Sequence, residues 1–312
     1  MSLSVFIDGG HGTTGLEIRD RLAARPEIGL IELGEIDRKK ENARRDALCS
    51  ADIAILCLPD DAAREAVAMV RTARTRIIDA STAHRTSPGW IYGFPELGGD
   101  QPGAIAEARF VANPGCYPTG FLALIAPLTA GGLLPNNAAI AVYAISGYSG
   151  GGRAMIEEFE SGGAKTANRA YGLSLDHKHL AEMQRYAGLA SPPVFAPHVV
   201  NAYRGMIVEI GLSLGQFASG VSPDDIRSCL EARYRNTLIS VLPASQSDAM
   251  DTIALEYRAG SDGLDIALYC NAQGSQIRLV AMLDNLGKGA AGAAVQNLNL
   301  MAGFEPTTGL TL

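Results

Sequence analysis

Residues 3–22, LSVFIDGGHGTTGLEIRDRL, join a short apolar run to a helical pattern through a cluster of glycines. The run Leu3–Asp8 predicts a strand, and the apolar residues after the glycines recur at helical spacing. Glycine lets the backbone turn tightly against a pyrophosphate, and a helix N-terminus offers it free N–H groups. The spacing Gly9-x-x-Gly12-x-x-Gly15 differs from the usual Gly-x-Gly-x-x-Gly, and an ordinary glycine-rich turn is the alternative. Its position between a strand and a helix favours a dinucleotide site.

Strands and helices continue to alternate after this loop. Ala62–Arg71 predicts a helix, and the acids just before it suit a helix start. Alternation of this kind implies a parallel sheet with right-handed crossovers. We therefore predict an α/β fold that opens with a Rossmann-like parallel-sheet nucleotide domain. The further predicted strands are Ile28–Ile36, Asp52–Leu58 and Arg76–Asp79.

The pattern changes near Asn113. Later strands have less helix between them, and some alternate polar and apolar residues as a mixed or antiparallel sheet does. The tail Lys288–Met301 is again helical, and we expect it to pack on the first domain. This divides the chain into a nucleotide domain, residues 1–114 with 285–312, and a central α+β domain for substrate binding and dimerisation, residues 115–284. The central strands are predicted at Ala138–Ile145, Met206–Leu214, Thr237–Leu242, Leu264–Tyr269 and Ile277–Leu283.

The composition excludes several classes of protein. The 312 residues are 47% hydrophobic and carry a net charge of −7, which argues against a nucleic-acid partner or an anionic membrane surface. No apolar run approaches the roughly 18 residues of a membrane span, and the N-terminus lacks a signal-peptide pattern. Five cysteines without a Cys-x-x-Cys pair fit a reducing compartment and offer no zinc or disulfide framework. We expect a cytoplasmic globular protein without a metal.

Charged residues close the second predicted strand. Glu35-Ile36-Asp37 places an acid where a ribose hydroxyl is bound, and Arg38-Lys39-Lys40 follow directly. A basic residue at this point can meet a 2′-phosphate, so we expect NADP(H) as cofactor. A solvated charge run is the alternative for the two lysines. The expected cofactor-binding residues are Gly9, Gly12, Thr13, Thr14, Gly15 and Arg38.

One cysteine stands in a setting suited to chemistry. Cys116 lies in the turn Asn113–Gly120 (NPGCYPTG), just before the apolar stretch Phe121–Leu128 that predicts a helix. A helix N-terminus lowers a thiol pKa and favours the nucleophilic thiolate, and its N–H groups can stabilise an oxyanion. Most cysteines are packing residues, as we expect for Cys57 within its apolar strand.

These motifs and others resemble the N-acetyl-gamma-glutamyl-phosphate reductases of arginine biosynthesis, and the length resembles their short-form subgroup. The glycine loop GGHGTTG departs from the commoner Gly-Ala-x-Gly-Tyr-x-Gly, which concerns cofactor contacts more than the reaction. The matching segments occur in family order over nearly the whole chain. They are Ile78–Arg85, Tyr92–Leu97, Asn113–Gly120, Ser146–Arg153, His177–His179, Pro197-His198, Arg204-Gly205, Lys288–Gly292 and Gln296-Asn297.

The resemblance implies NADPH-dependent reductive dephosphorylation of N-acetyl-gamma-glutamyl phosphate to N-acetylglutamate semialdehyde. The Cys116 thiolate would attack the acyl carbon and expel phosphate, and hydride would then reduce the resulting thioester. An aspartate-semialdehyde dehydrogenase, with a similar fold and cysteine chemistry, is the alternative enzyme. A non-catalytic dinucleotide sensor is the alternative from another class, but it leaves the cysteine turn unexplained. We expect a small-molecule substrate and a homo-oligomer, either a dimer or a tetramer.

An acid–base group is needed to move protons in this reaction. His177 and His179 are two residues apart and do not share a helix face, so we expect at most one to face Cys116. The family's His-x-His segment favours His179, with His177 next. His198, after Pro197, is a third candidate for the base, and orienting the substrate is its other expected role.

Anionic substrate groups call for arginine, which binds carboxylate or phosphate in a fork. The family-like motifs contain three arginines, for which ordinary salt bridges are the alternative. The serines and glycines around Ser146 are expected to hold phosphate or shape the site. The expected substrate-binding residues are Arg85, Ser146, Arg153, His198 and Arg204.

Overall fold

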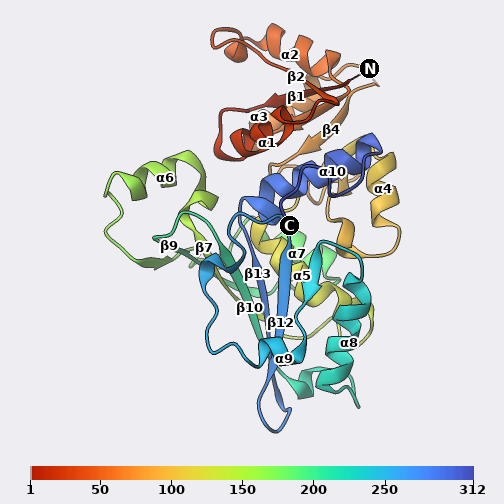
Figure 1. Cartoon of the computed structure of the whole chain (residues 1–312), viewed down its shortest axis with the longest axis vertical. Helices are drawn as coiled ribbons and strands as arrows, with labels where there is room; N and C mark the ends of the chain where they lie inside the picture. The colour runs from red at the N-terminus through yellow and green to blue at the C-terminus, as the bar shows by residue number, and fades with distance from the viewer. Residues whose placement is uncertain (1, 73) are drawn as a thin grey trace. The chain divides into compact units, whose positions relative to one another are not determined.

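The computed structural model describes residues 2–72 and 74–312, and the chain divides into two compact units (Figure 1). The C-terminal helix belongs to the same unit as the N-terminal strand, although nearly the whole chain separates them. Unit 1 runs to Pro95 and includes Asp100–Gly115 and Ala290–Leu310, whereas unit 2 contains Glu96–Gly99, Cys116–Gly289 and Thr311–Leu312.

Unit 1 is built on a parallel sheet of six strands in the order β2-β1-β3-β4-β6-β5. The chain moves outward from β1 in both directions, so the carboxyl ends of β1 and β3 flank the switch point where α/β sheets bind ligands. The strands are β1 (Leu3–Asp8), β2 (Ile28–Ile31), β3 (Ile53–Leu56), β4 (Arg76–Asp79), β5 (Ile91–Tyr92) and β6 (Phe110–Ala112).

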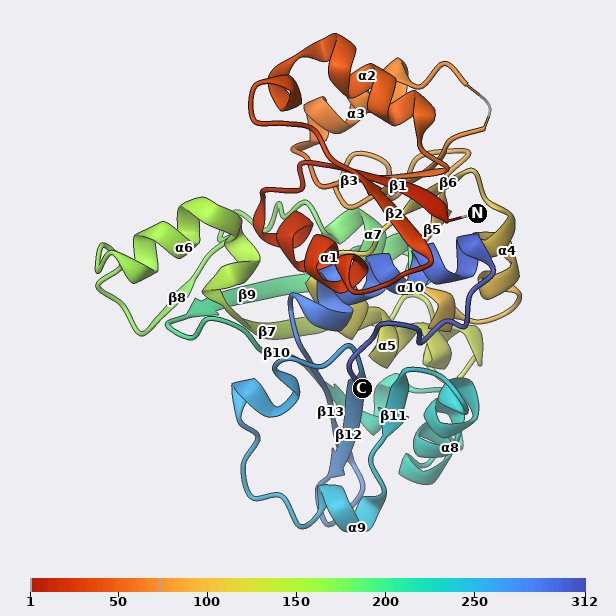
Figure 2. The same cartoon turned by 45° about the horizontal axis from the view of Figure 1, so that its top comes forward.

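Helices cover both faces of this sheet (Figure 2). Along β1, Val5 faces the layer of α1, α4 and α10, whereas its neighbour Phe6 faces α2 and α3. Because successive side chains point to opposite faces, a strand buried on both faces is apolar throughout. The predicted α/β class with a Rossmann-like domain is therefore confirmed. The helices are α1 (Thr13–Ala23), α2 (Glu41–Ser50), α3 (Asp60–Met69), α4 (Gln101–Glu107) and α10 (Gly292–Ala302).

Several predicted boundaries in unit 1 differ from the structure, and two of them lie near the glycine loop or at a helix start. β2 ends at Ile31 rather than Ile36, because Phe6 is the last residue of β1 that pairs with it. Residues 35–37 therefore lie in a loop and in the short turn η1 (Asp37–Lys39). Helix α3 begins at Asp60, two residues before the predicted start, so its two acids form the first helical turn.

Unit 2 contains a mixed sheet in the order β11-β12-β13-β10-β7-β9-β8. Most neighbours are antiparallel, and β7 with β9 and β11 with β12 are parallel. The sequence did not predict β9, which contains Pro197 in its interior, a residue that usually marks an edge strand or a loop. The strands are β7 (Ala141–Gly147), β8 (Asn168–Ala170), β9 (Val194–Val200), β10 (Met206–Ser213), β11 (Ile239–Val241), β12 (Leu264–Cys270) and β13 (Gln276–Leu283).

The central helix of unit 2 is α5 (Cys116–Ala130), which is buried on all sides from Tyr117 to Leu128. Pro127 lies inside this helix and has no N–H to donate to the Ala123 carbonyl. The Tyr234 hydroxyl makes that hydrogen bond instead, at 2.8 Å. The remaining helices and turns are α6 (Gly152–Glu160), α7 (Leu180–Tyr186), α8 (Pro223–Tyr234), α9 (Ala244–Ser247), η2 (Pro95–Leu97), η3 (Tyr148–Gly151), η4 (Leu214–Gln216), η5 (Leu255–Arg258) and the π-turn η6 (Gly287–Ala291).

No helix within residues 2–72 and 74–312 combines the length and the apolar character that crossing a membrane requires.

Candidate active site

The glycine loop connects β1 to α1 at the switch point of the unit 1 sheet. Gly9 has φ +86°, and a Cβ there would stand 2.2 Å from a backbone oxygen just after β3. A Cβ on Gly15 would stand 2.5 Å from the Gly9 oxygen. Gly12 is the N-cap of α1 and supplies no capping side chain, so the N–H groups at Thr13 and Thr14 are not capped locally. These residues fit a dinucleotide pyrophosphate, which needs close backbone approach and free N–H groups.

Two arginines lie near the ends of β1 and β2. Arg38 is in η1, where its Nη2 atom is 3.3 Å from Glu35 Oε1 at the surface. Arg44 of α2 forms a forked pair with Asp8, with its Nη2 2.8 Å from one carboxylate oxygen and its Nε 3.2 Å from the other. Asp8 directly precedes the glycine loop, so Arg44 offsets a negative charge that would otherwise repel phosphates. Sequence reasoning missed Arg44, although an acid at the end of β1 was a signal.

Cys116 is the first residue of α5. The sequence predicted a turn at Cys116 and a helix from Phe121, so the helix begins five residues earlier than predicted, although Cys116 still stands at a helix N-terminus. Within unit 2, the η6 turn packs against it, because a Cβ on Gly289 would stand only 2.9 Å from the Cys116 Cβ. Cys57 in unit 1 is different. Burial, with the charges of Asp79 and Asp8 adding to the effect, raises the pKa of its thiol to about 12, so it remains protonated.

The two histidines of the His-x-His segment pack ring to ring just before α7, with centroids 4.7 Å apart. Burial, with a smaller contribution from the charge of Lys178, lowers the pKa of His177 to about 4, so this imidazole is neutral near pH 7. The backbone N–H of His179 donates to His177 Nδ1 at 3.2 Å. An accepting Nδ1 in a neutral ring leaves the proton on Nε2. His177 can therefore donate through Nε2, while its Nδ1 lone pair is already engaged.

Tyr117 contacts all three histidines that are candidates for the acid–base group in unit 2. Its ring centroid lies 6.5 Å from that of His177 and 6.0 Å from that of His179. Its hydroxyl donates to the His198 carbonyl at 3.0 Å and accepts from Tyr171 at 3.3 Å. Burial raises the pKa of Tyr117 well above its usual value, and the charge of Cys116 contributes to this.

Tyr171 shares this environment with Tyr117. Burial raises the pKa of Tyr171 to about 12, again with a contribution from the charge of Cys116. Both phenols are therefore neutral near pH 7, and their hydroxyl protons are already donated to the His198 carbonyl and to Tyr117. The imidazole of His198 is turned to Asn168, with Nδ1 3.1 Å from Oδ1. Sequence reasoning did not select either tyrosine, although Tyr117 directly follows the cysteine.

Arg204 and Asp284 connect two loops of unit 2. The Arg204 Nε atom is 2.7 Å from Asp284 Oδ2. The other oxygen of this fully buried carboxylate accepts the N–H groups of Leu286 and Gly287, at 2.7 and 3.0 Å. The Asp284 carbonyl accepts from Gly289, the residue that packs on the cysteine. Asp284 thus positions both the arginine and the η6 turn, which its place at the end of an apolar strand did not indicate.

The segment Ser146–Arg153 is hydrogen-bonded to Asn285, the residue directly after Asp284. Ser146 is buried at the end of β7, where its hydroxyl donates to the Gly147 carbonyl at 3.0 Å. Ser149 accepts a 2.8 Å hydrogen bond from Asn285, whose Oδ1 accepts the N–H of the glycine after Arg204 at 2.9 Å. Arg153 is exposed near the start of α6.

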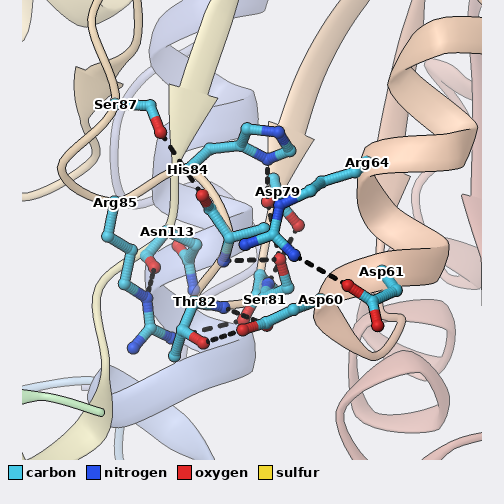
Figure 3. A network of polar contacts seen from close by, with 12 residues as sticks. Asp60, Asp61, Arg64, Asp79, Ser81, Thr82, His84, Arg85, Ser87 and Asn113 are labelled. Atoms are coloured by element: carbon cyan, nitrogen blue, oxygen red, sulfur yellow. Dashed lines mark hydrogen bonds and ion pairs between the residues drawn. The ribbon is translucent and has the colours of Figure 1, made fainter.

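Arg85 is placed in unit 1, buried beside the end of β6. Its Nε donates to the Asn113 carbonyl at 2.9 Å and its Nη2 to the Ala80 carbonyl at 3.3 Å. Figure 3 shows the guanidinium directed at this backbone, near the pair in which His84 Nδ1 lies 2.6 Å from Asp79 Oδ2. These contacts give Arg85 a role in holding the segment that leads to the cysteine turn.

No group of three or more His, Cys, Asp or Glu side chains with metal-ligand geometry occurs in the described part of the chain.

Comparison with family models assigns both halves of the chain. A model described as "Semialdehyde dehydrogenase, NAD binding domain" matches residues 4–105. A second, described as "Semialdehyde dehydrogenase, dimerisation domain", matches residues 116–285.

Curated relatives match almost end to end. N-acetyl-gamma-glutamyl-phosphate reductase 2 of Pseudomonas putida is 50% identical over 303 residues, which are 96% of each chain. The N-acetyl-gamma-glutamyl-phosphate reductase of Rhizobium leguminosarum bv. trifolii is 48% identical over 307 residues, 96% of this chain and 99% of its own.

Solved structures with this fold are aspartate semialdehyde dehydrogenases. Enzyme II of Vibrio cholerae, complexed with ASA, superposes with a TM-score of 0.74 at 18% identity, covering 97% of this chain and 98% of its own. The Candida albicans enzyme with NADP gives a TM-score of 0.66 at 13% identity, covering 97% and 99%. At these identities the likeness shows a shared fold.

Proposed function

This chain belongs to the N-acetyl-gamma-glutamyl-phosphate reductase family, and from that membership we propose how its own residues carry the reaction. The protein is an oxidoreductase that reduces N-acetyl-gamma-glutamyl phosphate to N-acetylglutamate semialdehyde in arginine biosynthesis, as the sequence predicted. The alternative, an aspartate-semialdehyde dehydrogenase, has weaker support, because those enzymes share the fold at 18% identity or less.

The observation that carries the mechanism is the position of Cys116 at the first residue of α5, next to neutral tyrosines. The dipole and N–H groups of a helix N-terminus favour the thiolate. We propose that Cys116 Sγ attacks the acyl carbon of the substrate. The carbon–oxygen bond to phosphate breaks, phosphate leaves with the bonding electrons, and the acyl group is held as a thioester.

A nicotinamide dinucleotide, when bound, supplies the hydride that reduces this thioester. The resulting oxyanion takes a proton from the acid–base group, which gives a thiohemiacetal held on Cys116. Loss of the proton from its hydroxyl lets the carbonyl form while the carbon–sulfur bond breaks. The aldehyde leaves, and the thiolate is restored for the next cycle.

We assign the general base to His179. A base needs an available lone pair, and in His177 the Nδ1 atom accepts a backbone hydrogen bond while Nε2 carries the proton. His177 is therefore suited to donating a hydrogen bond to substrate. His198 has its Nδ1 directed to Asn168, which favours an orienting role.

We propose that unit 1 binds NADP(H) at Gly9, Gly12, Thr13, Thr14 and Gly15. The steric need for glycine at two of these positions and the uncapped start of α1 support this assignment. Arg38 is proposed to meet the 2′-phosphate. Its partner Glu35 is exposed, so a phosphate can replace that carboxylate without leaving a buried charge unpaired.

The anionic groups of the substrate are proposed to bind in unit 2. Arg204 is held in place by Asp284. Ser146, at the end of β7, pairs with Met206, the first residue of the strand β10 that follows Arg204. Arg153, at the start of α6, is an exposed second cation for the carboxylate or phosphate. Arg85 is also proposed to bind substrate, although its described hydrogen bonds are to the backbone carbonyls of Asn113 and Ala80.

We also propose that the protein is a homodimer assembled through unit 2. The outward face of its sheet exposes Tyr143 on β7 and Val194 on β9, at 60% and 55%. Apolar side chains on an open sheet face are typical of an interface. The match to a dimerisation domain over residues 116–285 supports this choice.

We propose a cytoplasmic location for the protein. All five cysteines are free thiols, as is usual in a reducing compartment.

The decisive test is phosphate-dependent oxidation of N-acetylglutamate semialdehyde, with NADP and NAD compared side by side and aspartate semialdehyde as the competing substrate. We expect acetylglutamyl activity that is lost in Cys116→Ser while dinucleotide binding is kept. Substantial turnover by Cys116→Ser would remove the thioester mechanism. Preference for aspartate semialdehyde would favour the alternative enzyme.

A further inference from the structure

Asn113 has all four of its polar groups engaged inside unit 1, and it lies three residues before Cys116. Its backbone N–H donates to the Asp79 carbonyl at 2.7 Å, and its carbonyl accepts from Arg85 at 2.9 Å. Its side-chain Nδ2 donates to the Ala290 carbonyl at 3.0 Å, while Oδ1 accepts from Asn297 at 3.0 Å. With 1% of its surface exposed, Asn113 is fully satisfied without water.

The direction of the Asn113 amide follows from its partners. The Ala290 carbonyl can only accept, so the NH₂ group must face it. Asn297 Nδ2 also donates to the Gly93 carbonyl at 2.9 Å, which orients the second amide in the same way. Alanine at position 113 can make neither side-chain hydrogen bond, and an ionised aspartate can make only the one to Asn297.

The Asn113–Ala290 bond joins the two segments that continue into the catalytic part of unit 2. The first runs from Asn113 through Pro114-Gly115 to Cys116, and the second passes from Ala290 back to Gly289. Inside unit 2 these segments meet again, because the Gly289 backbone packs against the Cys116 Cβ. The same two segments are therefore fixed to each other on the unit 1 side by a hydrogen bond and on the unit 2 side by close packing.

Asn113 is itself rigidly held. Figure 3 shows it between Arg85 and the β4 end, where Asp79 also accepts from the backbone and hydroxyl of Ser81, at 2.9 and 2.7 Å. The His84 ring that completes this network stacks on Trp90, with centroids 4.1 Å apart. Asn113 itself has every polar group hydrogen-bonded, so it has little freedom to shift.

We propose that Asn113 is a positioning residue for Cys116: its amide sets the spacing between the cysteine turn and the η6 turn. This rests on the proposed role of Cys116 as the nucleophile. The hydrogen bonds of the Asn113 amide are to Ala290 and Asn297, so we infer that it acts through where Sγ stands. A misplacement of about 1 Å lowers a rate by about 10²-fold.

The test uses Asn113→Asp, which is nearly isosteric and keeps the acceptor for Asn297. Above its pKa the introduced carboxylate faces the Ala290 carbonyl and opens the contact. When protonated, its O–H can donate to that carbonyl, and burial raises the pKa of such a carboxyl. Asn113→Ala loses the contact at every pH. Asn137→Asp, at an exposed loop position, is the control for the same chemical change.

We expect Asn113→Asp to lower kcat about 10²-fold near pH 8, with KM and the dissociation constant of NADPH changed by less than about threefold. The ratio of variant to wild-type kcat should rise as the pH falls, whereas for Asn113→Ala it should stay low throughout. A purely structural role would not produce this pH-dependent recovery. Unchanged kcat, or equal ratios at all pH values in both variants, would overturn the proposal.

Failure of this inference and failure of the mechanism are distinguishable. If Cys116→Ser is inactive and the Asn113 variants are normal, only the positioning role is lost. If Asn113→Asp does not fold, the proposal is tested with Asn113→Ala. This variant should show a lower kcat and an unchanged dissociation constant for NADPH. Equal loss of NADPH binding and kcat in that variant would assign Asn113 to the stability of unit 1 and overturn the proposal.

Discussion

Replacing Gly15 with alanine tests whether the glycine loop is shaped for a dinucleotide. The new Cβ would lie 2.5 Å from the Gly9 oxygen and 2.7 Å from the Gly10 Cα, both backbone atoms that no rotamer can move away. An ordinary contact needs about 3.4 Å or more, so the loop must shift by nearly 1 Å.

Two opposing effects determine the size of the Gly15→Ala response. Alanine favours the helix by at most about 1 kcal/mol, because Gly15 lies within α1. Overpacking against fixed atoms costs about 1–3 kcal/mol. The steric cost is therefore larger, and it falls on the loop that must present its N–H groups to phosphate. For a steric cost of about 2–3 kcal/mol, subtracting the helix gain of about 1 kcal/mol leaves about 1–2 kcal/mol. Each 1.36 kcal/mol is a factor of ten, so we expect the dissociation constant for NADPH to rise by about 5- to 30-fold.

The assay is titration of NADPH with the purified protein, followed by nucleotide fluorescence. Gly29→Ala in β2 is the matched control, because the nearest atom to its Cβ is the Ser2 hydroxyl at 3.3 Å, which can turn away. Gly29→Ala should bind within about twofold of wild type. If Gly15→Ala also binds NADPH as the wild type does, the loop is not the pyrophosphate site and the reasoning fails.

Three further outcomes are expected. Arg38→Ala should weaken NADPH more than NADH in the same titration, and equal losses would reject Arg38 as the residue that selects the 2′-phosphate. Because the pKa of His177 is lowered to about 4 in the folded state from 6.5, the unfolded chain binds the extra proton first, so stability should fall as the pH drops from about 6.5 towards 4. Urea unfolding of His177→Gln should lack this part of the pH dependence, and an unchanged dependence would mean that His177 is not buried as a neutral ring. Tyr234→Phe should lower the unfolding free energy by about 1–3 kcal/mol, because it leaves the buried Ala123 carbonyl without a donor; a variant as stable as the wild type would show that this bond contributes nothing.

The local pattern was sufficient for much of the fold. The predicted limits of Leu3–Asp8 and Arg76–Asp79 agree with β1 and β4, because each strand has a buried apolar centre and ends at an aspartate. The alternation also predicted the parallel sheet correctly. β2 was drawn too long, since its end depends on where β1 stops pairing with it, and that information lies elsewhere in the chain.

For the site, the sequence by itself determined which residue types are available and where two of them stand locally: glycines between a strand and a helix, and Cys116 at a helix start. These are short-range properties, set by backbone geometry within a few residues. Only the tertiary structure decided that Asp284 holds Arg204, that the ring of His177 is neutral, and that Asn113 binds Ala290. Burial and hydrogen-bond partners are set by residues that can be far away in the chain, 177 positions in the last case, and no periodicity in the sequence encodes them.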